Sequence, residues 1–288
     1  MSEKLTWLVT GCSSGLGEAL VRAILATGDQ VIATARDGST SAVERLAPLK
    51  EAGAAVLELD VTSPEETLNE KAAEAWGIYG KIDVLVNNAA YIDGGIFEEI
   101  TEEFLTNSLR TNALGPLNLT RSLLPYMRSR KTGTLIFMSS IAAYYGHAAA
   151  SAYSSSKGFL EALVPCLALE VAQFGIRTCL VTPGYFRTSV FTPGNIYYRA
   201  PNPLPEYEEM NRLIREGVDA ADGNQPGDPA KAVAVLVDVV KGQGLCAGKE
   251  LPLRLPLGPD GITAVREDCQ AKLGICDEWA GIVSATNF

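Results

Sequence analysis

The sequence predicts an α/β protein built on a doubly wound parallel sheet of six or seven strands. Short apolar segments alternate with longer amphipathic segments along the 288 residues, and this alternation is typical of parallel sheets with helical crossovers. A glycine-rich turn joins the first apolar segment to the first amphipathic one. The segment 82–86 is apolar except for Asp83, as expected for a strand covered on both faces.

Each element of this sheet has its own local signal. We expect strands at 5–9, 30–35, 54–59, 82–86, 133–139, 176–181 and 251–257, and helices at 16–27, 39–53, 101–130, 151–174, 206–220, 227–240 and 259–273. A further helix starts at S-P-E-E, residues 63–66, with Ser63 as its N-cap. Asp228 is the predicted N-cap of the helix at 227–240. Pro165 should bend its helix, at about 3 kcal/mol unless packing offsets it. The whole is one Rossmann-type domain over residues 1–288, with no linker or repeat.

Composition narrows the class of function. A net charge of -10 and a pI near 4.8 argue against binding to nucleic acid or an anionic membrane surface. We find no apolar run of about 18 residues and no leader, so we expect no membrane span and a cytoplasmic location. The six cysteines lack C-x-x-C spacing and are predicted to be reduced. One histidine cannot form a multi-histidine site, and we expect no metal.

The glycine-rich turn T-G-C-S-S-G-L-G at 10–17 has the context of a phosphate-binding loop, between a strand and a helix. Gly11 permits the turn, Gly15 lets backbone approach a pyrophosphate, and Gly17 lets helix and sheet pack closely. The helix N-terminus then faces the anion. The alternative is a turn of structural use only. The candidate contacts to a dinucleotide here are Thr10, Gly11, Ser13, Ser14, Gly15, Leu16 and Gly17.

The ends of the next two strands indicate the type of dinucleotide. Ala35 occupies the position of the acidic residue that holds a ribose 2'-hydroxyl, and Arg36 follows it. An arginine there accommodates a 2'-phosphate, which favours NADP(H) over NAD. Asp37 could compete for the guanidinium, and Arg36 could also be a solvated surface residue. Asp60 ends the third strand, where it could accept from an adenine amino group or simply start a turn.

A proton-transfer site is predicted around S-I-A-A-Y-Y-G-H-A-A-A-S-A-Y-S-S-S-K at 140–157. On a helix, Tyr153 and Lys157 project from one face a turn apart. A cation there favours the phenolate and lowers the tyrosine pKa from about 10. Ser140, at the preceding strand end, could donate to the same substrate oxygen. The alternative is a solvated helix face.

Two further segments carry weaker signals. Asn112 and the nearby Gly115-Pro116 predict a local kink, in which freed carbonyls and a polar side chain hold water, although a surface asparagine is the alternative. Residues 189–227 are rich in proline and aromatic side chains, which suggests a substrate lid rather than a plain surface excursion. Its aromatic residues favour an apolar substrate.

Together these motifs resemble the short-chain dehydrogenase/reductase family, in its single-domain branch. The resemblance spans roughly residues 4–258 and rests on T-G-C-S-S-G-L-G, Asp60-Val61, N-N-A-A at 87–90, Asn112, Ser140, Y-S-S-S-K at 153–157 and P-G-Y-F-R-T at 183–188. Ala90 departs from the glycine usual in the family, which matters if that position needs a positive φ. The segments 31–37 and beyond Thr188 resemble members acting on bulkier ketones and alcohols, including 17-beta-hydroxysteroid and retinol dehydrogenase-like reductases, with a softer resemblance to fungal members.

The resemblance implies a role for each matching residue. Tyr153 would be the acid/base, Ser140 would orient the substrate, Lys157 would lower the tyrosine pKa and bind the nicotinamide ribose, and Asn112 would hold a relay water. The cofactor would be contacted by Asp60 and Val61 at the adenine, Asn87, Asn88 and Ala89 at the ribose, Pro183, Gly184 and Phe186 at the nicotinamide, and Thr188 at the carboxamide. His147 lies in a loop that often touches substrate, and it could equally pack at the surface. The resemblance also implies a homodimer or homotetramer, paired through helices near Thr101 and Ser151, an arrangement that Pro165 complicates.

We therefore expect an NADP(H)-dependent oxidoreductase that interconverts a carbonyl and a secondary alcohol on a small ketone or alcohol substrate. Two alternatives remain at this stage. One is a regulatory protein that binds NADP without chemistry, and the other is a dehydratase or epimerase that uses the same site.

Overall fold

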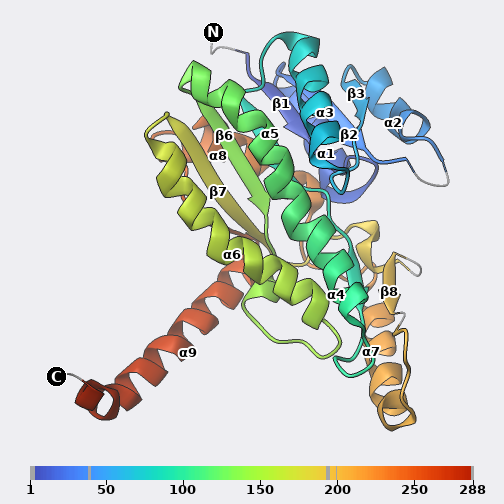
Figure 1. Cartoon of the computed structure of the whole chain (residues 1–288), viewed down its shortest axis with the longest axis vertical. Helices are drawn as coiled ribbons and strands as arrows, with labels where there is room; N and C mark the ends of the chain where they lie inside the picture. Colours follow the sequence, from blue (N-terminus) through green and yellow to red (C-terminus); the bar gives the residue numbers. More distant parts are fainter. Residues whose placement is uncertain (1–3, 38–39, 193–194, 199, 287–288) are drawn as a thin grey trace.

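The computed structural model describes residues 4–37, 40–192, 195–198 and 200–286. Its centre is a seven-stranded sheet of order β3-β2-β1-β4-β6-β7-β9, in which all neighbouring strands are parallel (Figure 1). The strands are β1 (Thr6–Val9), β2 (Gln30–Ala35), β3 (Ala55–Glu58), β4 (Val84–Asn87), β6 (Gly133–Met138), β7 (Ile176–Pro183) and β9 (Arg254–Leu257). The predicted doubly wound parallel sheet is confirmed.

Helices cover both faces of this sheet because alternate strand residues point to opposite sides. Trp7 and Val9 of β1 pack into a core with α1 (Gly15–Ala26), α2 (Ala42–Glu51) and α8 (Pro229–Lys241). Leu8, between them, packs into a second core with α3 (Glu65–Tyr79), α5 (Gly115–Arg130) and α6 (Ser151–Ala172). The sheet is therefore held between two helix layers, and its parallel strands all end at the same edge.

The helix starts test two capping predictions. Asp228 caps α8 as predicted, since its Oδ1 accepts from Ala230 N at 2.8 Å. The prediction for α3 was wrong by one residue: Pro64, and not Ser63, is the cap, and no side chain bonds the first turn. The extended ψ of 154° at Pro64 places the proline just outside the helix.

Pro165 lies inside α6, which continues through it from Ser151 to Ala172. A proline there removes the N–H partner of the Glu161 carbonyl, four residues earlier. Arg254 of β9 replaces it: Nη2 donates to Glu161 O at 3.0 Å, and Nε donates to Glu161 Oε2 at 2.9 Å. The Glu161 carbonyl therefore has a hydrogen-bond partner in place of the N–H that the proline lacks.

The sequence did not predict a small parallel sheet of β5 (Ile92–Gly94) and β8 (Ile196–Tyr198). It joins the segment after β4 to the 189–227 segment. The latter also contains α7 (Glu208–Ala221) and short 3-10 turns at Ser189–Phe191 and Pro205–Tyr207. Other short helical turns span Arg110–Leu114, Ile141–Ala143, Gly244–Cys246 and Ser284–Thr286, and α4 (Glu102–Leu109) precedes the first of these.

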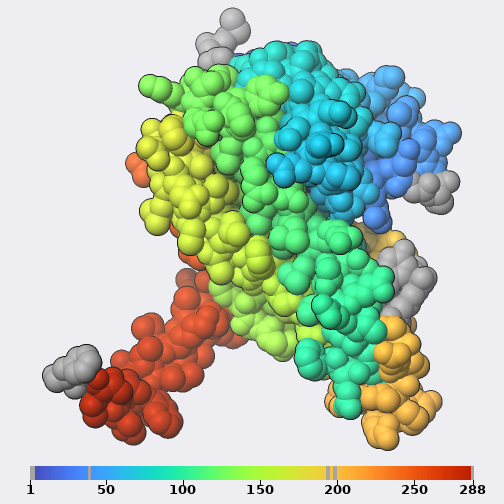
Figure 2. Space-filling view, in the orientation of Figure 1, coloured from blue at the N-terminus to red at the C-terminus, as the bar shows by residue number. Residues whose placement is uncertain are grey.

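The last helix, α9 (Pro259–Val283), is ten residues longer than predicted, because it continues through Gly274, a residue type that often ends a helix. Gly261 and Ala264 are buried at its base. From Cys269 onward every described residue is exposed, and the helix stands away from the body (Figures 1 and 2). Among the described residues, no helix combines the length and apolar character needed to span a bilayer.

Candidate active site

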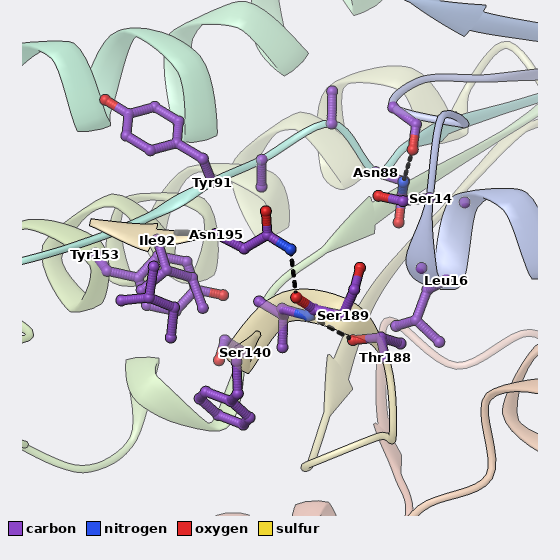
Figure 3. A pocket seen from close by; sticks show the side chains of 18 of the residues that line it. Ser14, Leu16, Asn88, Tyr91, Ile92, Ser140, Tyr153, Thr188, Ser189 and Asn195 are labelled. Atoms are coloured by element: carbon purple, nitrogen blue, oxygen red, sulfur yellow. Dashed lines mark hydrogen bonds between the residues drawn. The ribbon is translucent and has the colours of Figure 1, made fainter. Parts of the chain in front are cut away.

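A cleft of about 820 Å³ opens where the strands end. It lies beside β1 and β4, which are neighbours in the sheet although two strands separate them in the chain. Ligands of open parallel sheets bind at such a switch point. The turn after β1, the ends of β2, β3, β4, β6 and β7, and part of the 189–227 segment all contribute to its lining. Figure 3 shows Ser14 after β1, Asn88 after β4, Ser140 after β6 and Thr188 after β7 around this cleft.

Three positions of the glycine turn favour glycine. Gly11 and Gly15 have φ values of +70° and +61°, in the left-handed region. A Cβ at Gly17 would lie 2.3 Å from the Gly11 carbonyl oxygen and 2.6 Å from Asn88 Nδ2, so α1 can pack this closely only without a side chain there. Ser14 precedes α1 without a side-chain cap to its first-turn N–H groups. The first-turn N–H groups of α1 lie at the end of the helix next to the cleft, where an anion would be bound.

Residues after β4 hold this turn in place. Asn88 Nδ2 donates to Thr10 O at 2.8 Å and to Gly11 O at 3.1 Å. The Thr10 hydroxyl accepts from Asn88 N and Ala89 N. Ala90 has no positive φ, since the described non-glycine residues with one are Lys131 and Ala149. The alanine at 90 therefore leaves the local backbone unstrained.

Two arginines line the end of the cleft beyond β2. Arg36 is where the sequence predicted it, and Arg45 of α2 lies beside it, with its guanidinium donating to Arg36 O and lying 3.5 Å from Ser13 Oγ. Asp37 does not compete for Arg36: its carboxylate accepts from Ala42 N at 2.6 Å. Among the described residues, no carboxylate forms an ion pair with either arginine.

Arg45 is a site residue that sequence reasoning missed. The available signal was its position one turn into α2, directly after the Arg36 loop. Its Nε is buried without a hydrogen-bond partner, so part of its donor capacity is unused. A ligand with acceptor oxygens at this end of the cleft would satisfy it.

Ser140 and Tyr153 meet on the opposite side of the cleft from Ser14 and Leu16 (Figure 3). Ser140 follows β6, and its Oγ accepts from Ala142 N at 3.1 Å, which fixes its rotamer. Tyr153 is in the first turn of α6. Burial raises the pKa of Tyr153, and hydrogen bonding to the Ser140 side chain partly lowers it. The predicted depression of this pKa by Lys157 is therefore wrong for the protein alone.

Lys157 lies behind the cleft wall rather than beside the tyrosine hydroxyl. Its Nζ donates to Met138 O at 2.8 Å and lies 5.7 Å from the centre of the Tyr153 ring. Only 3% of Lys157 is exposed, and burial lowers the pKa of its amine to about 8. A partly desolvated ammonium is thus held below the tyrosine ring by a single backbone carbonyl.

Asn112 occupies a π-helical turn, Arg110–Leu114, between α4 and α5. At the position where the sequence predicted a kink, the chain leaves regular α-helical bonding in this π-turn. The side chain bonds the Tyr91 backbone in both directions, accepting from N at 3.0 Å and donating to O at 2.9 Å. Nδ2 also lies 3.2 Å from the hydroxyl of Ser156, the neighbour of Lys157. Asn112 therefore links the cleft wall to α6.

The end of the cleft beyond Ser140 is mostly apolar. Its lining includes Ile92, Ile141 and Phe191, together with Ile214 and Val218 from α7. His147 also lines the cleft, and its ring packs edge-on against Tyr145. Among the described lining residues, the formal charges are those of Arg36, Arg45 and Asp60, all after β2 or β3.

Most predicted site residues line this one cleft. They are Gly11, Ser13, Ser14, Gly15, Leu16, Gly17, Arg36, Asp60, Val61, Asn88, Ala89, Ser140, Tyr153, Pro183, Gly184, Phe186 and Thr188. Four lie in the layer directly behind the wall: Thr10, Asn87, Asn112 and Lys157. Asn87 Nδ2 donates to Thr120 of α5 at 3.1 Å, which ties the end of β4 to the helix layer.

Comparison with known proteins identifies the family. The model of the short chain dehydrogenase family matches residues 6–195. A short-chain dehydrogenase from Streptomyces avermitilis is 38% identical, with a TM-score of 0.85 over 99% of this chain and 100% of that chain. An L-fucose dehydrogenase of Bos taurus is 32% identical over 85% of this chain and 86% of its own. An actinorhodin polyketide ketoreductase variant with NADPH is 28% identical, with a TM-score of 0.70 over 88% of this chain and 94% of that chain.

The chain belongs to the short-chain dehydrogenase/reductase family, as its sequence motifs predicted, and is an oxidoreductase of that class. The likeness covers the seven-stranded sheet and the chain beyond it, because the Streptomyces structure matches over nearly the whole length.

Proposed function

We propose that this protein is an NADP(H)-dependent oxidoreductase that interconverts a carbonyl and a secondary alcohol on an uncharged, largely apolar small molecule. The observation that carries the proposal is the single cleft that joins a glycine turn at one end to Ser140 and Tyr153 further along. When bound, NADP(H) would supply or accept the hydride. The residues of the chain would bind both molecules and move the proton.

Tyr153 would give its hydroxyl proton to the substrate oxygen during reduction and take it back during oxidation. Ser140 would hold the same oxygen, since its hydroxyl is already oriented by Ala142 N. Lys157, below the ring, would bind the nicotinamide ribose. Asn112 would hold water beside Lys157, completing a path for the proton to solvent.

The dinucleotide would lie along the carboxyl ends of the strands. Its pyrophosphate would lie on the glycine turn and the N-terminus of α1, and its adenine near Asp60 and Val61. Asn87, Asn88 and Ala89 would border the adenosine ribose. The loop after β7, from Pro183 to Thr188, would hold the nicotinamide. Asp260 steadies this loop, because its carboxylate accepts from Tyr185 N at 2.5 Å.

Selection of NADP(H) over NAD(H) would rest on Arg36 and Arg45. A 2'-phosphate carries acceptor oxygens that suit planar guanidinium groups, and these two have no acidic partner among the described residues. Ala35 at the end of β2 supplies no carboxylate to hold a free 2'-hydroxyl.

The substrate would occupy the apolar end, beneath a lid formed by residues 189–227. Ile214 and Val218 would face it from α7, and His147 would contact it from the loop after Ser140. We also propose a homodimer or homotetramer of this chain, located in the cytoplasm. Phe159 and Leu169, which are 38% and 82% exposed on α6, support pairing through that helix.

A panel of apolar ketones, assayed by NADPH absorbance with product detection, tests this function. We expect NADPH consumption with at least one bulky ketone and an alcohol product in equal amount. Ser140→Ala should lower that rate about a hundredfold or more without lowering NADPH affinity. NADPH binding with no consumption across the panel would favour the purely regulatory alternative.

A further inference from the structure

Glu99 is a buried acidic residue outside the catalytic set. It follows β5, in the segment between the main sheet and α4, and is 0% exposed. No lysine or arginine among the described residues pairs with it. Burying a carboxylate without partners costs folding free energy. The hydrogen bonds that Glu99 makes must therefore account for its burial.

Among the described residues, the hydrogen-bond partners of Glu99 beyond its own turn come from the lid. Leu204 N donates to Oε1 at 2.9 Å. The amide of Asn211 donates to both oxygens, at 3.1 and 2.9 Å. The Glu99 carbonyl accepts from Asn202 N at 3.2 Å. One residue thus bonds the lid at three points within ten residues of chain.

These bonds fix the part of the lid that lines the cleft. Asn211 lies on α7 three and seven residues before Ile214 and Val218, so the three side chains share one helix face. Ile214 and Val218 line the cleft, whereas Asn211 reaches Glu99. The position of the Glu99 carboxylate therefore sets how far α7 reaches over the apolar end.

Little else holds α7 to the body. No residue of α7 is buried, and its ion pairs, from Arg212 to Glu209 and Glu216, are internal to the helix. Tyr207, just before it, donates to the exposed Glu98 at 2.8 Å. The β5–β8 pairing joins the lid to residues 92–94, which precede Glu99 in the same segment of the chain. A helix without buried residues is poorly fixed by apolar packing.

We propose that Glu99 is a positioning residue that holds α7 over the substrate end of the cleft. Among the described residues, Leu204 and Asn211 are the donors that compensate its buried charge; when the lid opens, water can solvate it. Because the buried charge needs these donors, it favours one closed position of the lid. Because water solvates the charge when the lid is open, the free-energy cost of opening stays small. This proposal rests on the proposed function for the claim that the apolar end receives substrate, but not for the contact itself.

Hydrogen exchange of the full chain, with no ligand added, tests the contact. In Glu99→Ala we expect amides of 204–221 to exchange about tenfold to a hundredfold faster, the range for losing hydrogen bonds to a charged group. Amides of β4 and β6 should keep their wild-type rates. Glu99→Gln should fall between, since its amide nitrogen cannot accept from the lid. Glu103→Gln, which removes the same charge from exposed α4, should match wild type.

Asn211→Ala provides a second route if Glu99→Ala folds poorly, because it removes the lid-side donors from a residue that is not fully buried. It should speed hydrogen exchange of the same amides. The double variant with Glu99→Gln should lower their free energy of protection by less than the sum of the two single variants. With an active ketone, Glu99→Gln should raise KM severalfold while NADPH affinity stays unchanged.

Unchanged exchange in 204–221 for both variants would overturn the proposal. Equal loss of protection in β4, β6 and α7 would also overturn it, because Glu99 would then stabilise the whole fold. Exchange needs no turnover, so faster α7 exchange in a protein that consumes no NADPH would uphold the contact and reject the proposed function. The reverse pattern would reject the positioning role alone.

Discussion

The two ends of the cleft are built differently. The end at the glycine turn consists of strand termini and the first turns of buried helices, and Asn88 and Thr10 bond it to the main sheet. The end at the lid comes from segments far apart in sequence, 92–100 and 189–218, and its helix α7 has no buried residue. The difference suggests that the cofactor end is a rigid product of the fold, whereas the substrate end depends on a few polar bonds and can vary without disturbing the sheet.

The largest effect is expected at the rigid end. Gly17→Ala places a Cβ 2.3 Å from a backbone oxygen, so α1 must move away from the turn. We expect NADPH affinity to fall more than about a hundredfold, the scale of losing several charged hydrogen bonds. Fluorescence titration with NADPH measures this.

Gly77→Ala on α3 is the matched control. A Cβ there meets nothing within 4 Å, so NADPH affinity should not change and the free energy of unfolding should rise by about 0.5–1 kcal/mol. Normal NADPH binding by Gly17→Ala would show that the turn does not require this close packing.

The second effect lies where the two ends meet. Lys157 is buried with a pKa lowered to about 8 from 10.5. Below pH 8 it is charged in both the folded and unfolded states, so the folded state bears the full cost of burial. Between pH 8 and 10.5 the unfolded state binds more protons, so wild-type stability should rise with pH, by roughly 3 kcal/mol at most.

Lys157→Met removes this dependence. We expect the variant to be more stable than wild type at pH 7, equal to it near pH 10.5, and inactive at both. Urea denaturation across this pH range measures the difference. A variant that is less stable than wild type at pH 7 would show that the ammonium is well compensated, and would contradict the account of its burial.

The third effect is expected at the two arginines, whose loss should weaken the binding of NADPH but not of NADH. Arg45→Gln should weaken NADPH binding about tenfold, as expected for one charged hydrogen-bond donor, and leave NADH binding unchanged. Lys50→Gln removes a charge from the same helix outside the cleft and should change neither. An equal loss for both dinucleotides would mean that Arg45 supports the turn rather than a 2'-phosphate.

The smallest effect is expected at the lid. Ile214→Ala should raise KM for an apolar ketone by roughly threefold to tenfold through lost apolar contact, with NADPH affinity unchanged. Met210→Ala, on the same helix but 45% exposed and away from the cleft, is the control. A change in NADPH affinity with Ile214→Ala would show that the two ends of the cleft are coupled rather than independent.

The same contrast explains what the sequence could predict. The end at the glycine turn is encoded by short motifs, each next to its own strand, so local pattern alone placed Gly11 and Gly17 at the cleft. Asp60 also lines the cleft, and its carboxylate accepts from Thr62 N at 2.8 Å, which is the turn-starting alternative. Arg45 escaped notice because its contact with the Arg36 loop depends on how α2 folds back. The direction of the Tyr153 pKa also required the structure, since burial is not visible in a Y-x-x-x-K spacing.

The substrate end was predicted only as a lid segment. The β5–β8 pairing and the bonds to Glu99 join residues about 100 apart in the chain, and no local periodicity reports such contacts. The replacement of a lost helical bond at Pro165 by Arg254 is hidden for the same reason. The predicted end of α9 at Leu273 lies directly before Gly274, but the helix continues through this glycine to Val283.

The central claim is that Tyr153, between the two ends, transfers the proton. The direct measurement compares NADPH affinity and turnover of an active ketone for wild type and Tyr153→Phe. Phenylalanine keeps the ring over Lys157 and removes only the hydroxyl. We expect unchanged NADPH affinity and turnover reduced by about a hundredfold to ten-thousandfold, the range for loss of a general acid. Turnover within a fewfold of wild type would contradict the account.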